Sequence, residues 1–413
     1  MLKPKHHPRL EGLEILKYVG PGFLVTTGFI DPGNWASNVA AGSSYGYGLL
    51  WIVSLSTLML ILLQHHAAHL GITTGLCLAE ASTRFFPSWL SRTFLGSSLV
   101  AAAATAFAEI LGSAIGLKML FGLPIALGAV FSTALVAIML LTHSYRRIER
   151  WIIAFVSLVS FSFLYEVYLS GADPVAIASR PFIPSFPEGS MLIIMSVLGA
   201  VVMPHNLFLH SEIIQSRQWN LEAESVIKRQ LKFEFVDTLV AMSVGWAINS
   251  AMIIVAAAVF FSRGIVVNDL SQAQAILKPL LGNGAATVFG LALVLAGISS
   301  SLTATMAGAS IYAGMFGESL DLSDSHSRAG LAVTLLGGLA GILIVSDSFR
   351  GLLWSQAVLS IQLPWTVIAL IFLTSSRRVM GKFANELWIK FILVLIAVIL
   401  AVFNCALFID FLR

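Results

Sequence analysis

Two short polar sequences interrupt long apolar stretches of this chain: Asp31-Pro32-Gly33-Asn34 and Met203-Pro204-His205-Asn206. Proline lacks a backbone N–H and clashes with the preceding turn, and glycine tolerates unwound backbone, so both sequences should break a helix. Together they offer a carboxylate, an amide and a thioether. Oxygen ligands alone suit Mg²⁺ or Ca²⁺, whereas a thioether adds affinity for Mn²⁺, Fe²⁺, Co²⁺ or Cd²⁺. The two sequences therefore predict a site for a divalent transition-metal ion.

The chain around these sequences has the composition of a membrane protein. Of its 413 residues, 57% are hydrophobic and only 11% are charged, and the mean hydropathy is +0.89. Soluble domains carry about 25% charged residues. The net charge of +3 is too small to indicate a nucleic-acid partner. Cys77 and Cys405 lie far apart in apolar sequence, so no disulfide framework is expected. Residues 1–17 show no cleavable signal peptide.

Apolar runs of about 18 or more residues predict eleven membrane-spanning helices. Their expected ranges are 19–42, 49–70, 94–119, 124–142, 151–170, 190–213, 235–261, 284–309, 329–346, 352–374 and 385–410. Seventeen Lys and Arg residues fall in segments on the same side as the N-terminus and six fall on the other side. By the positive-inside rule, the N-terminus is therefore cytoplasmic and the C-terminus extracellular.

The broken spans are the first members of two groups of five helices, and the second group is upside down relative to the first. The expected layout is a cytoplasmic tail (1–18), a first repeat (19–170, broken at 31–34), a proline-rich extracellular linker (171–189), an inverted second repeat (190–374, broken at 203–206) and an extra C-terminal helix (375–413). Broken spans at corresponding positions of two repeats indicate the binding site of a transporter. An intramembrane carboxylate such as Asp31 points the same way. The alternative is that Asp31 caps a half-helix and Met203 fills space.

The two sequences in their context resemble the two signature motifs of the Nramp family. The resemblance rests on Gly20-Pro21-Gly22-Phe23 through Asn34, residues 199–211, Gln64 with Leu70-Gly71-Ile72, Asp237-Thr238 with Asn249, and residues 355–364. It implies a LeuT-like fold and import of Mn²⁺ and Fe²⁺, generally with protons. It also implies the metal ligands Asp31, Asn34, Met203, the carbonyls of Ala200 and Gly28, and Gln356.

The residues expected to carry protons depart from the family pattern. The family usually has two acids in Thr-Asp-Leu-Ala-Glu, whereas this chain reads Thr105-Ala106-Phe107-Ala108-Glu109. Ile298 and Ala309 stand where glutamines are usual. A relay needs successive titratable groups, and it would run through Asp31, His205, Glu109 and Arg328. The alternative is that His205 is a buried spacer and Glu109 pairs locally.

A group of histidines marks the cytoplasmic end of the second span. His65 and His69 are four residues apart, the spacing by which two histidines on a helix share a metal ion. No glutamate lies between them to act as a general base, which argues against a zinc hydrolase. We expect Gln64, His65, His69 and His210 to line an inner vestibule.

These observations predict an all-α membrane protein of eleven transmembrane helices, built as a LeuT-like five-plus-five inverted repeat plus one helix. The expected function is secondary active import of Mn²⁺, with Fe²⁺, Co²⁺ and Cd²⁺, together with protons. No nucleotide-binding loop, cofactor, enzymatic activity, nucleic acid or obligate protein partner is expected. The expected partners are divalent metal ions, protons and the lipid bilayer, and the expected location is a bacterial plasma membrane. Three alternatives stay open: an uncoupled or Mg²⁺-carrying relative, an amino-acid or amine symporter of the same fold, and a membrane-embedded metallohydrolase using His65 and His69.

Overall fold

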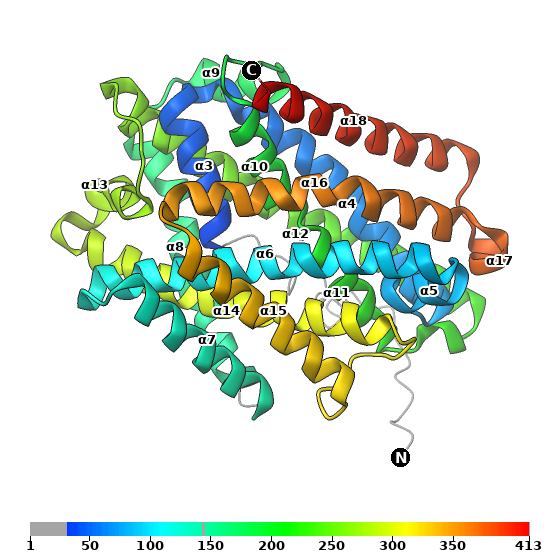
Figure 1. Ribbon diagram of the computed structural model, residues 1–413. Helices are drawn as coiled ribbons and strands as arrows, with labels where there is room; N and C mark the ends of the chain where they lie inside the picture. The colour runs from blue at the N-terminus through cyan, green and yellow to red at the C-terminus, as the bar shows by residue number, and fades with distance from the viewer. Residues whose placement is uncertain (1–30, 143–144, 413) are drawn as a thin grey trace.

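The computed structural model describes residues 31–142 and 145–412, without the side chains of residues 145–156 and 281. Helices make up the fold and no β-strand occurs in these ranges, so the all-α prediction is confirmed (Figure 1). The long helices are α3 (Pro32–Tyr45), α4 (Leu50–Thr74), α6 (Ser88–Phe121), α7 (Ile125–Leu141), α8 (Tyr145–Leu169), α10 (Met191–Val202), α11 (Pro204–Gln215), α12 (Glu224–Val259), α14 (Ala285–Gly314), α15 (Ser325–Ile344), α16 (Ser348–Ser375) and α18 (Leu387–Phe411).

Short elements connect the long helices. The short α-helices are α5 (Leu78–Phe85), α9 (Pro174–Ser179), α13 (Lys278–Leu281) and α17 (Arg377–Met380). The 3₁₀ turns are η2 (Gly46–Leu49), η3 (Arg180–Phe182), η4 (Trp219–Leu221), η5 (Phe261–Arg263), η6 (Leu270–Leu277), η7 (Gly282–Gly284) and η8 (Gly381–Phe383). The predicted tail (1–18) and the first part of the first span (19–30) lie outside the described residues.

Eight helical segments of the described chain are long and apolar enough to cross a membrane. One of them, Pro32–Thr74, contains both α3 and α4, and another, Met191–Gln215, contains α10 and α11. Two shorter apolar helices, Ile125–Leu141 and Ser157–Leu169, complete the set. These segments correspond to the eleven predicted spans. The protein is an integral membrane protein.

Several helices are longer than their apolar runs predict. The predicted span 235–261 belongs to α12, which begins at Glu224. Its first turns carry charges that apolar periodicity does not detect, and the ion pair between Lys228 and Glu224, four residues apart, supports helix there. Similarly, α6 begins at Ser88 rather than near residue 94. Apolar runs locate the membrane core but not the full helix.

The outermost helix shows the pattern of a surface in contact with lipid. In Figure 1, α18 lies along the edge of the molecule. Only 28% of its most apolar 18-residue stretch is buried. Apolar side chains such as Phe391, Val398 and Val402 are exposed on it. Exposure of this kind is unfavourable in water and neutral against acyl chains.

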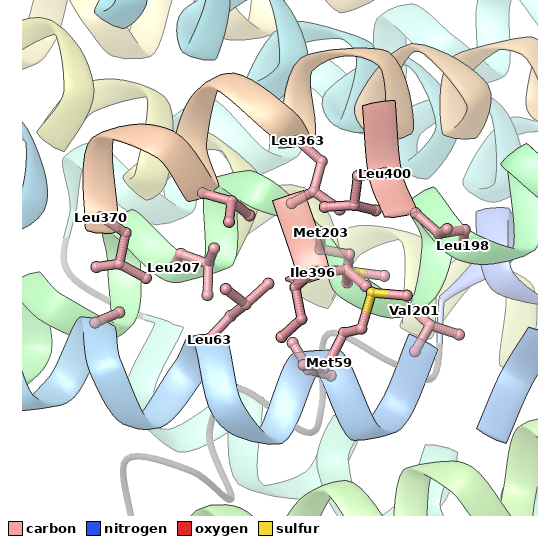
Figure 2. Close-up of a cluster of buried hydrophobic side chains, with 14 of the residues drawn as sticks. Met59, Leu63, Leu198, Val201, Met203, Leu207, Leu363, Leu370, Ile396 and Leu400 are labelled. Carbon is pink, nitrogen blue, oxygen red and sulfur yellow. The ribbon is translucent and has the colours of Figure 1, made fainter. Parts of the chain in front are cut away.

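The interior between α4, α10, α11, α16 and α18 is a packed cluster of apolar side chains. Figure 2 shows Met59 of α4 beside Val201 of α10, and Leu63 of α4 beside Leu207 of α11, with residues of α16 and α18 completing the cluster. Lipid tails are as apolar as leucine, so close packing rather than transfer from water stabilises such an interface. The cluster fixes α10 and α11 against α4 and α16, and these helices carry the site described next.

Candidate metal centre

The second break is one residue wide. α10 ends at Val202, α11 begins at Pro204, and Met203 between them has φ 44° and ψ 83°. In an unbroken helix the carbonyl of Ala200 would accept from the backbone N–H of residue 204, which proline lacks. That carbonyl instead accepts from Nδ2 of Asn34 at 2.9 Å. The sequence Met203-Pro204 thus releases a helical carbonyl to a side chain of α3.

The first break places a carboxylate at the start of a helix. Asp31 is the N-cap of α3, and its Oδ1 accepts from the backbone N–H of Asn34 at 2.7 Å. Pro32 occupies the first helical position, where a missing N–H costs nothing. The capping role considered from the sequence is therefore real. It leaves lone pairs on both carboxylate oxygens, so capping and metal binding are compatible.

Asn34 joins the two breaks. Its Nδ2 donates to Oδ2 of Asp31 at 2.9 Å as well as to the carbonyl of Ala200. Asp31, Asn34 and Ala200 are completely buried. The structure therefore brings together, from α3 and α10, three of the groups that the sequence nominated.

Gln356 of α16 covers this group. A Cβ on Gly33 would lie 2.1 Å from Nε2 of Gln356, and a Cβ on Gly199 would lie 1.9 Å from its carbonyl oxygen. Only glycine admits α16 so close to both breaks. Oε1 and Nε2 of Gln356 and Oδ1 of Asn34 are buried without a hydrogen-bond partner among the described residues. Unpaired buried oxygens beside a carboxylate suit a cation.

The thioether of Met203 is nearby but directed elsewhere. Its sulfur accepts from Nδ2 of Asn206 at 3.2 Å, and its side chain joins the apolar cluster of Figure 2. Met203 is 2% exposed. Gly28, the remaining nominated ligand, lies outside the described residues.

The nominated proton residues are brought together only in part. Glu109 of α6 is fully buried. Its carboxyl lies near that of Asp31, but neither of the Glu109 oxygens has a hydrogen-bond partner in the described part of the chain. Nδ1 of His205 lies 3.1 Å from Oγ1 of Thr105. Arg328 is exposed at the start of α15, where its Nε donates to the carbonyl of Leu322. Arg328 therefore does not join the buried group.

Ala106, the residue that replaces a family acid, lies in a helix contact. A Cβ on Gly338 of α15 would come within 3.2 Å of the Ala106 Cβ and 2.8 Å of the backbone nitrogen of Phe107. Ala106 is completely buried there. Ala106 therefore packs directly against Gly338 where α6 and α15 approach each other closely.

The nominated vestibule residues form a second polar group. Nδ1 of His210 lies 2.5 Å from Oε1 of Gln64, and Nδ1 of His65 lies 2.5 Å from Oε2 of Glu234. The ring centres of His65 and His69 are 6.1 Å apart. His210 follows Met203 by seven residues, which is about 10 Å of helix rise.

Sequence reasoning missed three groups that support these sites. Oγ of Ser37 donates to the carbonyl of Gly33 at 2.9 Å and pairs with Oγ of Ser196 at 2.5 Å, which ties α3 to α10. Glu234 is buried although it stands in a charged segment. The sequence does contain one indication of this role, because Thr238 follows Glu234 by four residues on the same helix. Its hydroxyl donates to the carboxylate of Glu234 at 2.7 Å.

Comparisons with known proteins identify the family of the chain. A family model described as natural resistance-associated macrophage protein-like (Nramp) matches residues 22–410. A divalent metal cation transporter MntH of Caldanaerobacter subterraneus is 36% identical over 96% of this chain and 93% of its own. The crystal structure of the Eremococcus coleocola manganese transporter, in complex with an aromatic bis-isothiourea compound, has a TM-score of 0.79 at 29% identity, covering 97% of this chain and 88% of that one.

A more distant likeness concerns the fold alone. Mhp1, a nucleobase-cation-symport-1 family transporter, has a TM-score of 0.62 at 19% identity, covering 87% of this chain and 79% of that one. Mhp1 has the LeuT fold, so the likeness supports the predicted LeuT-like architecture.

Proposed function

The chain belongs to the Nramp family of membrane transporters, and we propose that it imports Mn²⁺, with Fe²⁺, Co²⁺ and Cd²⁺, through the buried group at its two helix breaks. The relatives named for divalent metal cation and manganese transport support the substrate class. One observation carries the proposal: the buried amide of Asn34 links the carboxylate of Asp31 to the freed carbonyl of Ala200.

The ligand set follows from these contacts. Asp31 supplies a negative charge, and the carbonyl of Ala200 supplies a neutral oxygen. Rotation of the Asn34 amide group by half a turn would exchange its Nδ2 and its unpaired Oδ1, so that Oδ1 could bind the ion. Gln356 contributes Oε1 from α16, and the carbonyl of Gly28 is a further expected ligand. Such a group of oxygens fits a hard or borderline dication.

Selectivity requires the sulfur of Met203. Methionine has three rotatable side-chain bonds, so the thioether can leave Asn206 and turn toward the ion without moving the backbone. A sulfur ligand adds affinity for transition-metal ions and none for Ca²⁺ or Mg²⁺. We therefore assign the rejection of hard ions to this residue.

Alternating access follows from the burial of the group. Because Asp31, Asn34 and Gln356 are fully buried, an ion can enter or leave only when helices move. Met203 alone separates α10 from α11, so α11 can tilt relative to α10 about this one residue, provided that its side chains in the apolar cluster, such as Leu207, repack. On the other side of the group, α3 begins at Pro32, directly after its capping residue Asp31.

Proton coupling is assigned to Glu109. Its carboxyl faces Asp31, so a proton lost from Asp31 as the ion binds has an acceptor beside it. His205, against Thr105, is the next titratable group beside the break. Arg328 lies at the surface and would act only as an exit.

A proteoliposome assay with a trapped pH dye tests substrate and coupling together. Mn²⁺ uptake with interior acidification, and little Mg²⁺ uptake, is the expected result. Mg²⁺ entry at a rate comparable to Mn²⁺ would refute the assigned selectivity. Absence of Mn²⁺ entry would refute the function.

The uncoupled alternative is favoured by one observation, the packing of Ala106 where a second acid is usual. Glu109→Gln separates the two cases. If Glu109 receives the proton, the variant retains Mn²⁺ uptake but loses most acidification, and its uptake no longer changes with pH as in the parent. An unaltered pH dependence would support an uncoupled carrier. Competition of Mn²⁺ uptake by amino acids would instead indicate an amino-acid symporter.

The orientation is part of the proposal. We place the N-terminus on the cytoplasmic side, as the distribution of Lys and Arg predicts. We place the protein in a bacterial plasma membrane on the same basis. Labelling of a single cysteine at Arg180 or Arg378 from the outside of intact cells distinguishes the two orientations.

A further inference from the structure

We propose that His65 and His69 of α4 form a second transition-metal site, nitrogen-based and separate from the group at the helix breaks. Glu234 of α12 supports it, and His210 of α11 lies beside it. The site would bind Zn²⁺, Ni²⁺ or Co²⁺ in preference to Mn²⁺. Its binding chemistry stands on its own, and only its role in ion release rests on the proposed function.

A carboxylate orients His65 for metal binding. Nδ1 of His65 lies 2.5 Å from Oε2 of Glu234, while Oε1 of Glu234 accepts from the hydroxyl of Thr238 at 2.7 Å. With Glu234 ionised, the carboxylate can only accept, so Nδ1 would carry the hydrogen and Nε2 would keep its lone pair for an ion. Histidines that bind metals almost always donate their other N–H to a carboxylate or carbonyl in this way.

His69 supplies the second nitrogen from the next turn of the helix. The two rings are nearly parallel, with an interplanar angle of 21° and ring centres 6.1 Å apart. Two imidazoles that bind one Zn²⁺ through nitrogens at about 2.0–2.1 Å have ring centres roughly 5–6 Å apart. Nε2 of His69 is buried without a hydrogen-bond partner among residues 31–142 and 145–412. Because stacked rings direct their in-plane lone pairs side by side, both side chains must turn about their χ angles before the two nitrogens can converge on one ion.

His210 adds a third imidazole with a free nitrogen. Its Nδ1 lies 2.5 Å from Oε1 of Gln64, and an amide oxygen only accepts, so the lone pair of His210 is on Nε2. That nitrogen is also buried and unpaired in the described part of the chain, and His210 interacts electrostatically with His65. Water or His210 can fill the positions that His65 and His69 leave open.

The donor set decides which ions prefer this site. Imidazole suits Zn²⁺, Ni²⁺, Cu²⁺ and Fe²⁺, and affinity for a given nitrogen site is lowest for Mn²⁺. The group around Asp31 offers mainly oxygen. The side chain of His65 is 22% exposed, so an ion can reach it. We therefore expect Mn²⁺ to pass this site and Zn²⁺ to be retained on it.

Titration calorimetry with Zn²⁺ on purified protein tests the site. The background carries Asp31→Ala, which removes the charge of the first site. It also carries His326→Gln, because the exposed group of Glu318, Asp324 and His326 has ligand atoms within 4.8 Å of one another. The N-terminal pair His6 and His7 is replaced by glutamine. One bound Zn²⁺ per chain is expected to remain in this background.

Three variants of that background identify the ligands. His65→Gln with His69→Gln should abolish the remaining Zn²⁺ binding. Glu234→Gln, which keeps the shape of the side chain, should weaken it about 10–100-fold. His66→Gln is the matched control, since Nδ1 of His66 is bonded to the carbonyl of Leu62 and its ring is not part of the pair. The control should bind Zn²⁺ unchanged.

Two results would overturn the proposal: no Zn²⁺ binding in the background, or binding that survives loss of both histidines. If the double variant does not fold, unchanged affinity in Glu234→Gln overturns it instead. Mn²⁺ uptake by the parent protein, measured from the same preparation, separates failure of this site from failure of the proposed function.

Discussion

The two helix breaks look alike in sequence, since each has a proline directly after a proposed ligand, but they are built differently. Asp31 has extended backbone, with φ −125° and ψ 158°, and its own side chain caps the helix that follows. Met203 has a left-handed backbone, φ 44°, and no side-chain cap. The first break is satisfied by local hydrogen bonds, whereas the second depends on its surroundings.

The two breaks would therefore contribute differently to ion binding. The first break contributes charge, because the N-terminus of α3 stabilises the carboxylate of Asp31. The second contributes shape, because a left-handed methionine costs about 1–2 kcal/mol and persists only where packing holds it. That packing is the close approach of Gly199 to the backbone of α16. A charge change should therefore be most damaging at the first break and a volume change at the second.

The largest expected effect is that of Asp31→Ala. Loss of a charged partner from a buried site costs about 3–5 kcal/mol, so the affinity for Mn²⁺ should fall at least 100-fold. We expect Mn²⁺ uptake to be lost as a result. Equilibrium binding of ⁵⁴Mn²⁺ to purified protein and uptake into proteoliposomes measure it. Asp31→Asn keeps the cap and loses the charge, so it should fail as completely. Near-normal binding by Asp31→Asn would show that capping, not charge, is the function of this residue.

Substitution of the matched glycines separates the two breaks by volume. In Gly199→Ala the new Cβ would lie 1.9 Å from the backbone carbonyl oxygen of Gln356. The backbone of α16 cannot move away as easily as the end of a side chain can. In Gly33→Ala it would meet the end of the Gln356 side chain, which can rotate. Overpacking of this kind costs roughly 1–3 kcal/mol. We expect a lower unfolding temperature in detergent for Gly199→Ala and little change for Gly33→Ala. Equal losses would mean that both breaks depend on packing alike.

The prolines of the two breaks should differ by a smaller amount. Pro204→Ala restores the N–H that can donate to the carbonyl of Ala200, which would withdraw that carbonyl from the site. Pro32→Ala restores an N–H at the first helical position, where none is needed. Mn²⁺ affinity should therefore fall about tenfold, or roughly 1.4 kcal/mol, in Pro204→Ala and hardly at all in Pro32→Ala. Binding isotherms of the two variants decide it, and a stronger effect in Pro32→Ala would contradict the reading of the first break.

The sequence was sufficient for the helix class, the number of spans, the cap formed by Asp31 and the release of the Ala200 carbonyl, because each follows from local rules, whereas the meeting of Asn34 with Ala200 was expected only through the family resemblance. Apolar length predicts spans, and proline at position 204 leaves the carbonyl at position 200 free. What it could not supply depends on neighbours far away in the chain. The burial of Glu234 beside His65 requires α12 to pack on α4. The exposure of Arg328 and the orientation of the Met203 sulfur depend on tertiary packing in the same way, and no periodicity encodes them.

The smallest expected effect concerns selectivity at Met203, and two substitutions separate the side chain from the backbone. Met203→Ala removes the sulfur and keeps the left-handed strain, whereas Met203→Gly removes the sulfur and relieves about 1–2 kcal/mol of that strain. If the thioether rejects hard ions, both variants should still take up Mn²⁺ weakly and both should be inhibited by Ca²⁺ several-fold more strongly than the parent. They should differ from each other only in unfolding temperature, with glycine the more stable. Ca²⁺ competition curves for Mn²⁺ uptake provide the measurement. Unchanged discrimination in both variants would show that the second break contributes shape alone, and that the oxygen groups around Asp31 select the ion.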